Sequence, residues 1–335
     1  MLAPMEGVVD HTMRTMLTAV GGIDRCVTEF VRVTTARLPV KTFHRYCPEL
    51  HNDGLTPSGV PVYVQLLGGQ PEPMAINAER AAALGAPGID INFGCPAKQV
   101  NRSDGGSVLL KEPDRVFAII DAVRKAVPAE TPVTAKIRLG FEDRSLLGDV
   151  SQAVFAANAS ELTIHARTKE DGYKPPAYWA AIEDINASSP IPIIANGEIW
   201  SVDDYHQCIR ESGCADIMLG RGILACPDLA KQINAAQRQQ ANTAMDWLMV
   251  VELLAQFCVV TEAMYQRRYV GNRVKQWLGY LRRQYPLAKV LFEDIKRLKW
   301  PEDIAAAIEA HKKANTLRGS SNIRNKLNHN IEPED

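Results

Sequence analysis

The sequence predicts an α/β fold, a (β/α)8 TIM barrel followed by a small all-helical C-terminal domain. Up to about residue 240, short β-branched segments alternate with amphipathic helical segments, which is typical of βαβ units in a parallel sheet. Eight such strands can be counted, and this number favours a closed barrel over a doubly wound sheet. From residue 245 to about 314 the chain has helical periodicity without a convincing strand. At 335 residues the chain has room for both parts.

The predicted strands are almost continuously apolar, as expected for parallel barrel strands that are buried on both sides. In chain order they are Leu2–Met5, Cys26–Glu29, Val62–Leu67, Gly88–Asn92, Val133–Arg138, Glu161–His165, Ile191–Ala195 and Asp216–Leu219. Amphipathic helices are expected between them. Asp114–Ala126 and Leu147–Ala157, for example, have apolar residues at three- and four-residue spacing.

A polar stretch at residues 237–243 predicts a boundary between the barrel and the helical part. The expected domains are therefore residues 1–240 and residues 241–315. The remaining residues, 316–335, are polar and end in Glu-Pro-Glu-Asp, so we expect a disordered tail there.

The composition is that of an ordinary soluble globular protein, with 46% apolar and 23% charged residues. The seven cysteines lack a Cys-x-x-Cys pair and the seven histidines lack a metal-binding spacing. We therefore expect a reducing, cytoplasmic setting without a disulfide framework or a metal site. The N-terminus shows no signal-peptide pattern, and the absence of a run of about 18 apolar residues predicts that no segment spans a membrane.

Charge is unevenly distributed along the chain. The whole sequence has a formal net charge of −1, but residues 266–299 contain ten Lys and Arg against two acidic residues and so carry +8. The rest of the chain then carries −9. This asymmetry indicates that an anionic partner contacts the C-terminal part.

Candidate functional residues lie at or just after the carboxyl ends of the predicted strands, where (β/α)8 barrels carry their active sites. Cys95 follows the fourth strand, and a thiol there could be a nucleophile, a metal ligand, a proton donor or only a small buried side chain. The others are Gln65, Lys136, His165, Asn196-Gly197-Glu198 and Gly220-Arg221-Gly222. The last two groups follow strands seven and eight, where such barrels frequently bind phosphate, and Arg221 supplies a suitable cation.

Each of these residues alone has an ordinary structural explanation. A lysine at a strand end is commonly an ion-pair partner, a lone histidine is commonly a satisfied polar residue, and Gly-Arg-Gly is commonly a turn. Their occurrence at the same end of successive strands indicates one active site. Pro4 and Gly7, at the end of the first strand and just beyond it, would let the backbone approach a flat ligand closely.

Several motifs run through the barrel in a recognisable order. They are Ala3-Pro4-Met5-Glu6-Gly7, Asn92-Phe93-Gly94-Cys95-Pro96, Gly105-Gly106-Ser107 with Leu109-Leu110, Lys136-Ile137-Arg138, His165-Ala166-Arg167-Thr168, Asn196-Gly197-Glu198-Ile199 and Gly220-Arg221-Gly222. In this order they resemble the tRNA-dihydrouridine synthases. Two further segments, 28–32 (TEFVR) and 274–282 (VKQWLGYLR), are similar to the bacterial C type, which reduces the uridine at position 16 of the tRNA D-loop.

The resemblance implies an FMN-binding catalytic barrel at residues 1–240, a helical tRNA-binding domain at residues 241–315, and NADPH as the electron source. Carried over by position, Cys95 would be the catalytic proton donor. The cofactor-binding residues would be Pro4, Met5, Glu6, Gln65, Lys136, His165, Asn196, Gly197, Glu198, Gly220 and Arg221. We expect a cytoplasmic monomer whose partner is tRNA, with no metal and no membrane.

The chemistry that the resemblance implies suits these residue types. Reduction of the C5–C6 double bond of uridine needs a hydride at C6, which reduced flavin supplies, and a proton at C5. Lys136 would stabilise the negative charge of the reduced flavin. A thiol with a pKa of about 8.5 is mostly protonated at neutral pH, so Cys95 could donate the proton. The target base must be extruded from the folded RNA to reach the flavin.

Affinity for a folded RNA comes mostly from phosphate contacts. On a helical projection of residues 273–283, Val274, Trp277, Leu278 and Leu281 share one side, with polar and basic residues around the other. The expected tRNA-binding residues are Arg273, Lys275, Gln276, Tyr280, Arg282 and Arg283. Such a helix alone could equally be a solvated amphipathic one, but the local charge of +8 favours RNA binding.

Three alternatives stay open on the sequence alone. A flavin-dependent barrel reductase of a small-molecule pyrimidine would share the barrel motifs but has no use for a basic helical domain. A Schiff-base aldolase would use Lys136 as its nucleophile. A catalytically inactive RNA-binding or chaperone protein would have no need of Cys95 or of the phosphate-binding loops.

Overall fold

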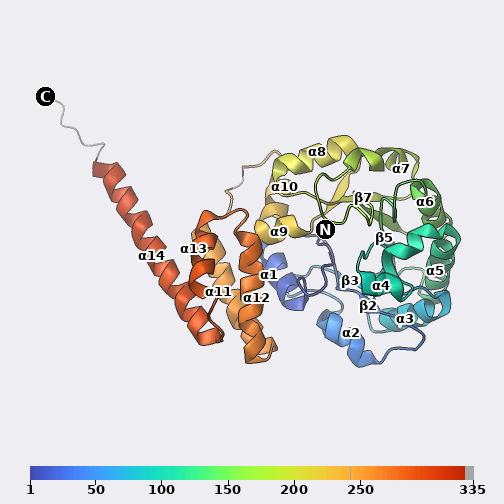
Figure 1. The fold of residues 1–335 in the computed structure, drawn as a ribbon, viewed down its shortest axis with the longest axis horizontal. Helices are drawn as coiled ribbons and strands as arrows, with labels where there is room; N and C mark the ends of the chain where they lie inside the picture. The colour runs from blue at the N-terminus through green and yellow to red at the C-terminus, as the bar shows by residue number, and fades with distance from the viewer. Residues whose placement is uncertain (242, 329–335) are drawn as a thin grey trace. The chain divides into compact units, whose positions relative to one another are not determined.

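The computed structural model describes residues 1–241 and 243–328, and the chain divides into two compact units (Figure 1). The barrel unit comprises Met1–Ile223 and Asp228–Ala241. The helical unit comprises Leu224–Pro227 and Asn242–Asp335.

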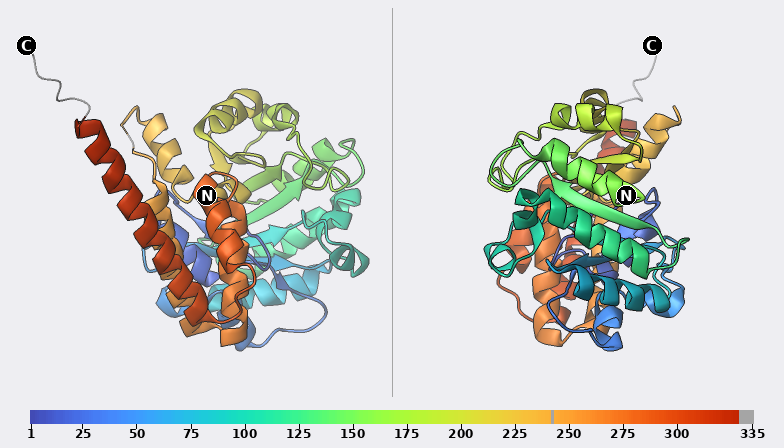
Figure 2. Two further views of the ribbon diagram at one scale, coloured as in Figure 1. Left: turned by 60° about the vertical axis from the view of Figure 1, so that its left-hand side comes forward. Right: turned by 90° about the vertical axis from the view of Figure 1, so that its right-hand side faces the viewer.

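The barrel unit is a parallel sheet with helices on its outside (Figures 1 and 2). Its strands are β1 Cys26–Val27, β2 Val31–Arg32, β3 Val62–Leu67, β4 Ile89–Asn92, β5 Val133–Arg138, β6 Glu161–His165, β7 Ile193–Asn196 and β8 Asp216–Met218. They are hydrogen-bonded in the order β1-β3-β4-β5-β6-β7-β8, β2 also pairs with β3, and every pairing is parallel. The predicted fold class is confirmed.

The sheet closes on itself through Leu2, which forms parallel bridges to both Cys26 and Leu219. The expected first strand is reduced to this bridge because the chain turns directly afterwards. The Met5 carbonyl accepts a hydrogen bond from the N–H of Val9 at 2.9 Å, which begins the approach to the first helix.

The expected second strand, Cys26–Glu29, is shorter than predicted, and a further strand, β2, follows it. β1 and β2 pair with successive parts of β3. Between them, the Thr28 hydroxyl accepts a hydrogen bond from the Gln65 N–H at 3.0 Å, so a side chain takes over the role of a backbone partner. Two residues, Val31 and Arg32, are too few to show the alternation that identifies a strand in a sequence.

Helices separate most of the strands of the barrel unit, and α5 and α6 lie where the apolar spacing predicts. They are α1 His11–Val20, α2 Val40–Tyr46, α3 Pro71–Ala83, α4 Lys98–Arg102, α5 Pro113–Ala126, α6 Leu147–Ala156, α7 Glu183–Ser188, α8 Val202–Ser212, α9 Arg221–Ala225 and α10 Leu229–Gln237, with 3-10 turns η1 Pro48–Asn52, η2 Gly106–Lys111 and η3 Trp179–Ile182. Two helix starts have side-chain caps: Asp10 accepts from the Met13 N–H at 2.9 Å and Ser201 accepts from the Asp204 N–H at 3.1 Å.

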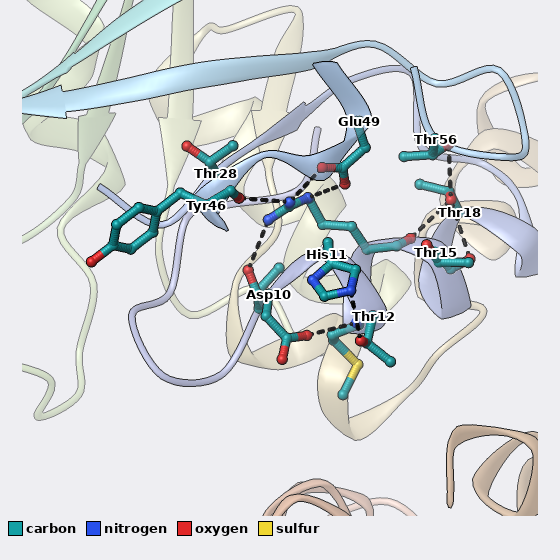
Figure 3. A network of polar contacts seen from close by, with 12 residues as sticks. Asp10, His11, Thr12, Thr15, Thr18, Thr28, Tyr46, Glu49 and Thr56 are labelled. Atoms are coloured by element: carbon teal, nitrogen blue, oxygen red, sulfur yellow. Dashed lines mark hydrogen bonds and ion pairs between the residues drawn. The ribbon is translucent and has the colours of Figure 1, made fainter. Parts of the chain in front are cut away.

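A buried ion pair anchors α1 against η1. Arg14 is fully buried, and its guanidinium donates to both carboxylate oxygens of Glu49 at 2.8 Å. It also donates to the carbonyls of Val9 at 3.3 Å and Tyr46 at 3.0 Å. Figure 3 shows the ends of this network at Glu49 and Tyr46. Burial alone would raise the pKa of Glu49, but the Arg14 guanidinium holds it below its ordinary value. Removing one partner of such a pair costs about 3–5 kcal/mol, because the other charge is left buried.

The helical unit contains four described helices, α11 Trp247–Met264, α12 Arg267–Leu281, α13 Pro286–Ile295 and α14 Pro301–Asn328. Trp277 of α12 is buried in its core, where its ring meets that of Phe257 edge to face at 4.9 Å. The Trp277 indole N–H donates to the Leu224 carbonyl at 3.1 Å, so the buried polar atom is satisfied.

Helix α14 is continuous in Figure 2 and overlaps the segment expected to be a disordered tail, residues 316–335. The structure continues this helix to Asn328. Residues 329–335 lie outside the described residues.

One described helix, α11, is long and apolar enough by length and composition alone to cross a membrane, with a mean hydropathy of 1.6. Eight of its residues are buried, including Val250, Leu254 and Phe257, and it packs on α12 and α14. Glu252 and Glu262 also interrupt its apolar sequence. These are features of a core helix in the helical unit. The expected absence of a membrane span stays a prediction.

Candidate active site

Several predicted site residues converge inside the carboxyl end of the barrel. Strand register places Asn92 beside Lys136 and His165 beside Asn196. The Lys136 ammonium donates to Asn196 Oδ1 at 2.9 Å. Because β6 lies between β5 and β7, this contact crosses the inside of the barrel, so both side chains point inward.

Lys136 is a lysine whose charge is easily lost. Burial and, to a lesser degree, the Arg138 guanidinium lower the pKa of Lys136 to about 8, against the raising effect of Asp90. Its ammonium is therefore mostly protonated at neutral pH and loses its proton as the pH rises through this value. A cation held at this depth suits a ligand atom that becomes negative.

His165 is held in its neutral form. Burial first, and then the surrounding cations, of which Arg138 and Lys136 contribute most, lower its pKa well below the ordinary value. Its ring lies against the backbone of Gly197, where a Cβ atom would come within 2.7 Å of His165 Cδ2. Gly197 also has a φ of +116°, so a side chain at this position would be both strained and blocked. Glycine at position 197 therefore leaves room for the His165 imidazole beside the end of β7.

Cys95 is the half-buried thiol of this site, and its turn is fixed from both sides. Asn92 Oδ1 accepts from the Cys95 N–H at 2.9 Å and from the Gly94 N–H at 3.0 Å. The Cys95 carbonyl accepts three hydrogen bonds, from the Ser107 N–H at 3.1 Å, the Ser107 hydroxyl at 2.9 Å and the Asn101 amide at 3.0 Å. Burial raises the pKa of the thiol, so it stays protonated at neutral pH.

Gly106 makes this arrangement possible. Its φ is +70°, and a Cβ atom there would lie 2.8 Å from the Cys95 carbonyl oxygen and 3.0 Å from Cys95 Cβ. The chain can therefore pass this closely over the cysteine only with glycine at position 106.

Gln65 is fully buried, and both ends of its amide are engaged. Its Nε2 donates to Asp90 Oδ2 at 2.7 Å, and its Oε1 accepts from Asn92 Nδ2 at 2.8 Å. An amide nitrogen carries a second hydrogen and an amide oxygen a second lone pair, so Gln65 keeps capacity for a ligand.

A cluster of charges lies after β6, β7 and β8. Glu198 Oε1 pairs with Arg221 at 2.6 Å and lies 3.4 Å from Arg167 Nη2. Arg167 is fully buried, and among the described residues neither Nη1 nor Nη2 has a hydrogen-bond partner. A buried guanidinium with unused donors next to a second arginine fits an anionic group such as a phosphate. A Cβ atom on Gly220 would meet nothing closer than 3.9 Å, which leaves room on that loop.

Pro4, Met5 and Glu6 form the turn that follows the closing bridge. Pro4 and Met5 are half-buried and Glu6 is exposed. Gly7, the next residue, donates its N–H to Glu29 Oε1 at 2.5 Å, which ties this turn to the segment between β1 and β2.

Three residues of this region, Arg138, Arg167 and Tyr173, are not among the predicted site residues. Arg138 donates to the Gly94 carbonyl at 2.8 Å and to the carbonyls of Thr168 and Gly172 at 3.0 Å, so it joins the cysteine turn to the loop after β6. The exposed Tyr173 ring lies 5.1 Å from Arg138 and 5.2 Å from Arg221.

A sequence signal existed for Arg138. It stands two residues after Lys136 on the same predicted strand. Since side chains two residues apart along a strand point to the same face, Arg138 faces the same side as an inward-facing site residue. Arg167 lies beyond the end of β6 at His165, so this alternation does not apply to it. Nothing in the sequence near Tyr173 carries an equivalent signal.

The six expected tRNA-binding residues lie on or just after α12, in two rows. Arg273, Gln276, Tyr280 and Arg283 are spaced by three or four residues and share one face. Lys275 and Arg282 are seven residues apart and share another. In that second row, the Lys275 ammonium donates to the Leu298 carbonyl and the Arg282 guanidinium lies 4.0 Å from the Phe292 ring centre.

Comparison with known proteins identifies relatives over most of the chain. The sequence profile of the family described as dihydrouridine synthase (Dus) matches residues 1–316. The tRNA-dihydrouridine(16) synthase of Shewanella oneidensis is 50% identical over 308 residues, which cover 92% of this chain and 96% of that protein. The proteins of the same name from Aquipseudomonas alcaligenes and Vibrio cholerae are 49% identical over 296 residues and 47% identical over 312 residues, and the matches cover 94% and 95% of their lengths.

Solved structures show a likeness in fold. Histamine dehydrogenase from Rhizobium sp. 4-9 matches 77% of this chain and 48% of its own, with a TM-score of 0.53 at 15% identity. The 6-hydroxypseudooxynicotine amine oxidase of Pseudomonas geniculata N1 gives a TM-score of 0.53 at 12% identity, over 77% of this chain and 50% of its own. The profile and the relatives confirm the resemblance found in the sequence: the chain belongs to the dihydrouridine synthase family.

Proposed function

We propose that this protein is an FMN-dependent tRNA-dihydrouridine synthase that takes electrons from NADPH and reduces the uridine at position 16 of the D-loop. The observation that carries the proposal is Cys95, which among the seven cysteines is the one that is not buried. On a chain of this family, a protonated thiol on a fixed turn at the barrel mouth has the properties of a proton donor. We infer a cytoplasmic monomer that needs no metal.

The FMN site would use the predicted residues around the barrel mouth. Gln65 and Lys136 would bind the polar edge of the ring system, and Pro4, Met5 and Glu6 would border it. The ribityl chain and phosphate would lie against His165, Asn196, Gly197, Glu198, Gly220 and Arg221. When bound, the flavin supplies the hydride for C6 of uridine. The Lys136 ammonium would stabilise negative charge without reorganisation, because it is already in place.

Cys95 would give the proton to C5. Its backbone is held at the N–H by Asn92 and at the carbonyl by Asn101 and Ser107, so the thiol projects from a fixed position. Donation leaves a thiolate, which must regain a proton before the next turnover. Half exposure of Cys95 supports access of water for that step.

The tRNA would be bound largely through its phosphates by the helical unit. Support comes from the ten Lys and Arg between residues 266 and 299 and from the row formed by Arg273, Gln276, Tyr280 and Arg283. Position 16 is supported by the names of the relatives, tRNA-dihydrouridine(16) synthases that are 46–50% identical to this chain.

The test is reconstitution with tRNA that lacks dihydrouridine. Purified protein should carry FMN and, with NADPH, should convert position 16, as mapped by sequencing for dihydrouridine. A product at position 20 and none at 16 would overturn the site assignment but not the reaction. A protein that takes up no FMN would overturn the cofactor, and reduction of free uridine without reduction of tRNA would favour a small-molecule pyrimidine reductase.

A further inference from the structure

Four side chains and one turn of the barrel unit form a continuous chain of hydrogen bonds. The Thr134 hydroxyl donates to Asp90 Oδ1 at 2.6 Å, and Gln65 Nε2 donates to Asp90 Oδ2 at 2.7 Å. Asn92 Nδ2 then donates to Gln65 Oε1 at 2.8 Å. Finally, Asn92 Oδ1 accepts from the Cys95 N–H at 2.9 Å. The chain runs from β5 through β4 to β3, returns to β4 at Asn92 and ends at the backbone N–H of Cys95.

The two ends of this chain fix the orientation of both amides between them. Both oxygens of Asp90 accept, Oδ1 from Thr134 and Oδ2 from Gln65, so Gln65 turns its nitrogen toward Asp90 and its oxygen toward Asn92. The backbone N–H groups at the other end only donate, so Asn92 must turn its oxygen toward Cys95 and its nitrogen toward Gln65. Both requirements lead to the same arrangement. If either amide flipped, two donors or two acceptors would face each other in the interior.

These groups are out of reach of solvent, which makes a broken link costly. Asp90 is 1% exposed, Gln65 is fully buried and Asn92 is 9% exposed. An unsatisfied buried polar group costs about 1–3 kcal/mol, so the two amides keep the one orientation in which both are satisfied.

We propose that Asp90 is a positioning residue that, through Gln65 and Asn92, sets the amide of Gln65 and the backbone of Cys95 in the orientation that the reaction requires. The proposal rests on the proposed function of Cys95 as proton donor and of Gln65 as a cofactor contact. Asp90 would touch neither cofactor nor substrate. It would act by determining whether each amide turns its nitrogen or its oxygen toward its neighbour.

The test compares Asp90→Leu with Asp90→Asn in the FMN-loaded enzyme. Leucine removes both acceptors at nearly the same size. Asparagine preserves the orientation, because its oxygen can accept from Gln65 while its nitrogen donates to a rotated Thr134 hydroxyl. Thr134→Val is the matched control, since it removes only the outer bond and leaves the order of the amides intact.

Two measurements are made on each variant. The first is the rate of Cys95 alkylation by iodoacetamide, followed by mass spectrometry, because the other six cysteines are buried. The second is single-turnover oxidation of the reduced flavin by tRNA. Asp90→Leu should raise alkylation at Cys95 severalfold and slow oxidation by tRNA at least about tenfold, the scale of a displaced catalytic group. Asp90→Asn and Thr134→Val should stay within about threefold of the wild type.

Wild-type alkylation and oxidation rates in Asp90→Leu would overturn the proposal, as would an Asp90→Asn variant as impaired as Asp90→Leu. If Asp90→Leu does not yield folded enzyme, Asp90→Ser, whose hydroxyl replaces one of the two acceptors, is measured against the same outcomes. Should the wild type fail to reduce tRNA, the proposed function falls, while the alkylation comparison still decides the role of Asp90.

Discussion

Strands β3, β4 and β5 carry polar side chains that are hydrogen-bonded to one another, whereas the loops after β6, β7 and β8 bring two arginines together and leave donors of one of them, Arg167, unused. In the first half, Gln65 and Asn92 have partners at both ends of their amides. In the second half, Arg167 is buried with unused donors beside Glu198 and Arg221. The first half is organised before any ligand binds, and the second half is incomplete without an anion. Such a division suits a ligand with a neutral polar ring at one end and a phosphate at the other.

The largest effect should come from the organised half. Cys95→Ala removes the proposed proton donor and leaves every hydrogen bond of its backbone in place. We expect single-turnover oxidation of reduced flavin by tRNA to slow at least about a hundredfold, the scale of general acid catalysis. FMN affinity and flavin reduction by NADPH should match the wild type. Oxidation by tRNA at the wild-type rate would show that Cys95 is not the acid.

In the incomplete half, loss of an arginine should weaken FMN binding, because the arginines would contact the FMN phosphate. Arg167→Met and Arg221→Met should each weaken FMN binding about ten- to a hundredfold, because a charge-assisted hydrogen bond contributes about 1.5–3 kcal/mol. Fluorescence titration of the FMN-free protein gives the affinity. Riboflavin, which lacks the phosphate, is the matched control, and its affinity should change little. An equal decrease for both flavins would place the arginines elsewhere than at the phosphate.

Lys136 lies between the two halves and should make the rate of flavin reduction by NADPH depend on pH. Its pKa is lowered to about 8 by burial, so the ammonium is present below that pH and deprotonated above it. If its charge stabilises reduced flavin, the rate of flavin reduction by NADPH should fall as the pH rises above about 8, by up to about tenfold per unit. Lys136→Arg keeps its charge throughout this range and should flatten the profile. A wild-type profile that is flat from pH 7 to 9 would contradict the assignment.

The two rows of polar and basic residues on and just after α12 allow a similar comparison within the helical unit. Here we expect the smallest effect, a change in the salt dependence of tRNA binding. Arg273→Ala with Arg283→Ala should reduce the salt dependence of tRNA binding by roughly two units of slope, about 0.9 for each phosphate that is no longer neutralised. Arg273 also has contacts within the chain, with Gln276 of its own row and with the Tyr265 ring. Lys275→Ala with Arg282→Ala should reduce the slope less, since the Lys275 ammonium donates to the Leu298 backbone carbonyl and the Arg282 guanidinium lies over the Phe292 ring, two groups outside the proposed tRNA-binding row. FMN content should be unchanged in both. If the salt dependence changed as much or more for the second pair, the row with Lys275 and Arg282 would be the one that contacts the tRNA.

The barrel was predictable because its longer strands carry an unambiguous pattern. β3 and β5 have the predicted bounds, Val62–Leu67 and Val133–Arg138. The first strand was not predictable as a bridge at Leu2, since its length depends on where the chain turns away to meet Asp10 and α1. Short pieces such as β2 are defined by their partner strand and not by their own residues.

The site was predictable as a set of residues and not as a set of roles. Cys95, Lys136 and His165 could be identified because strand ends of a barrel converge. Arg167 could not, because a strand-end arginine in a sequence is indistinguishable from an ion-pair partner. What singles it out is burial together with unused donors, and both depend on the tertiary structure. The hydrogen-bond order from Asp90 to Cys95 likewise exists only once β3 and β4 are side by side.

The three hydrogen bonds that end on the Cys95 carbonyl also stabilise the segment that packs against the cysteine, residues 101–107, against local opening. Residues 101–107 cannot lift away without releasing all three bonds at once, so their opening is a local unfolding event. The amide of Ser107 donates one of these bonds, so its hydrogen exchange reports how often the segment separates from the Cys95 carbonyl. Slow exchange would mean that the backbone of Cys95 keeps its position between turnovers. A uridine entering the barrel would then meet a proton donor that is already oriented.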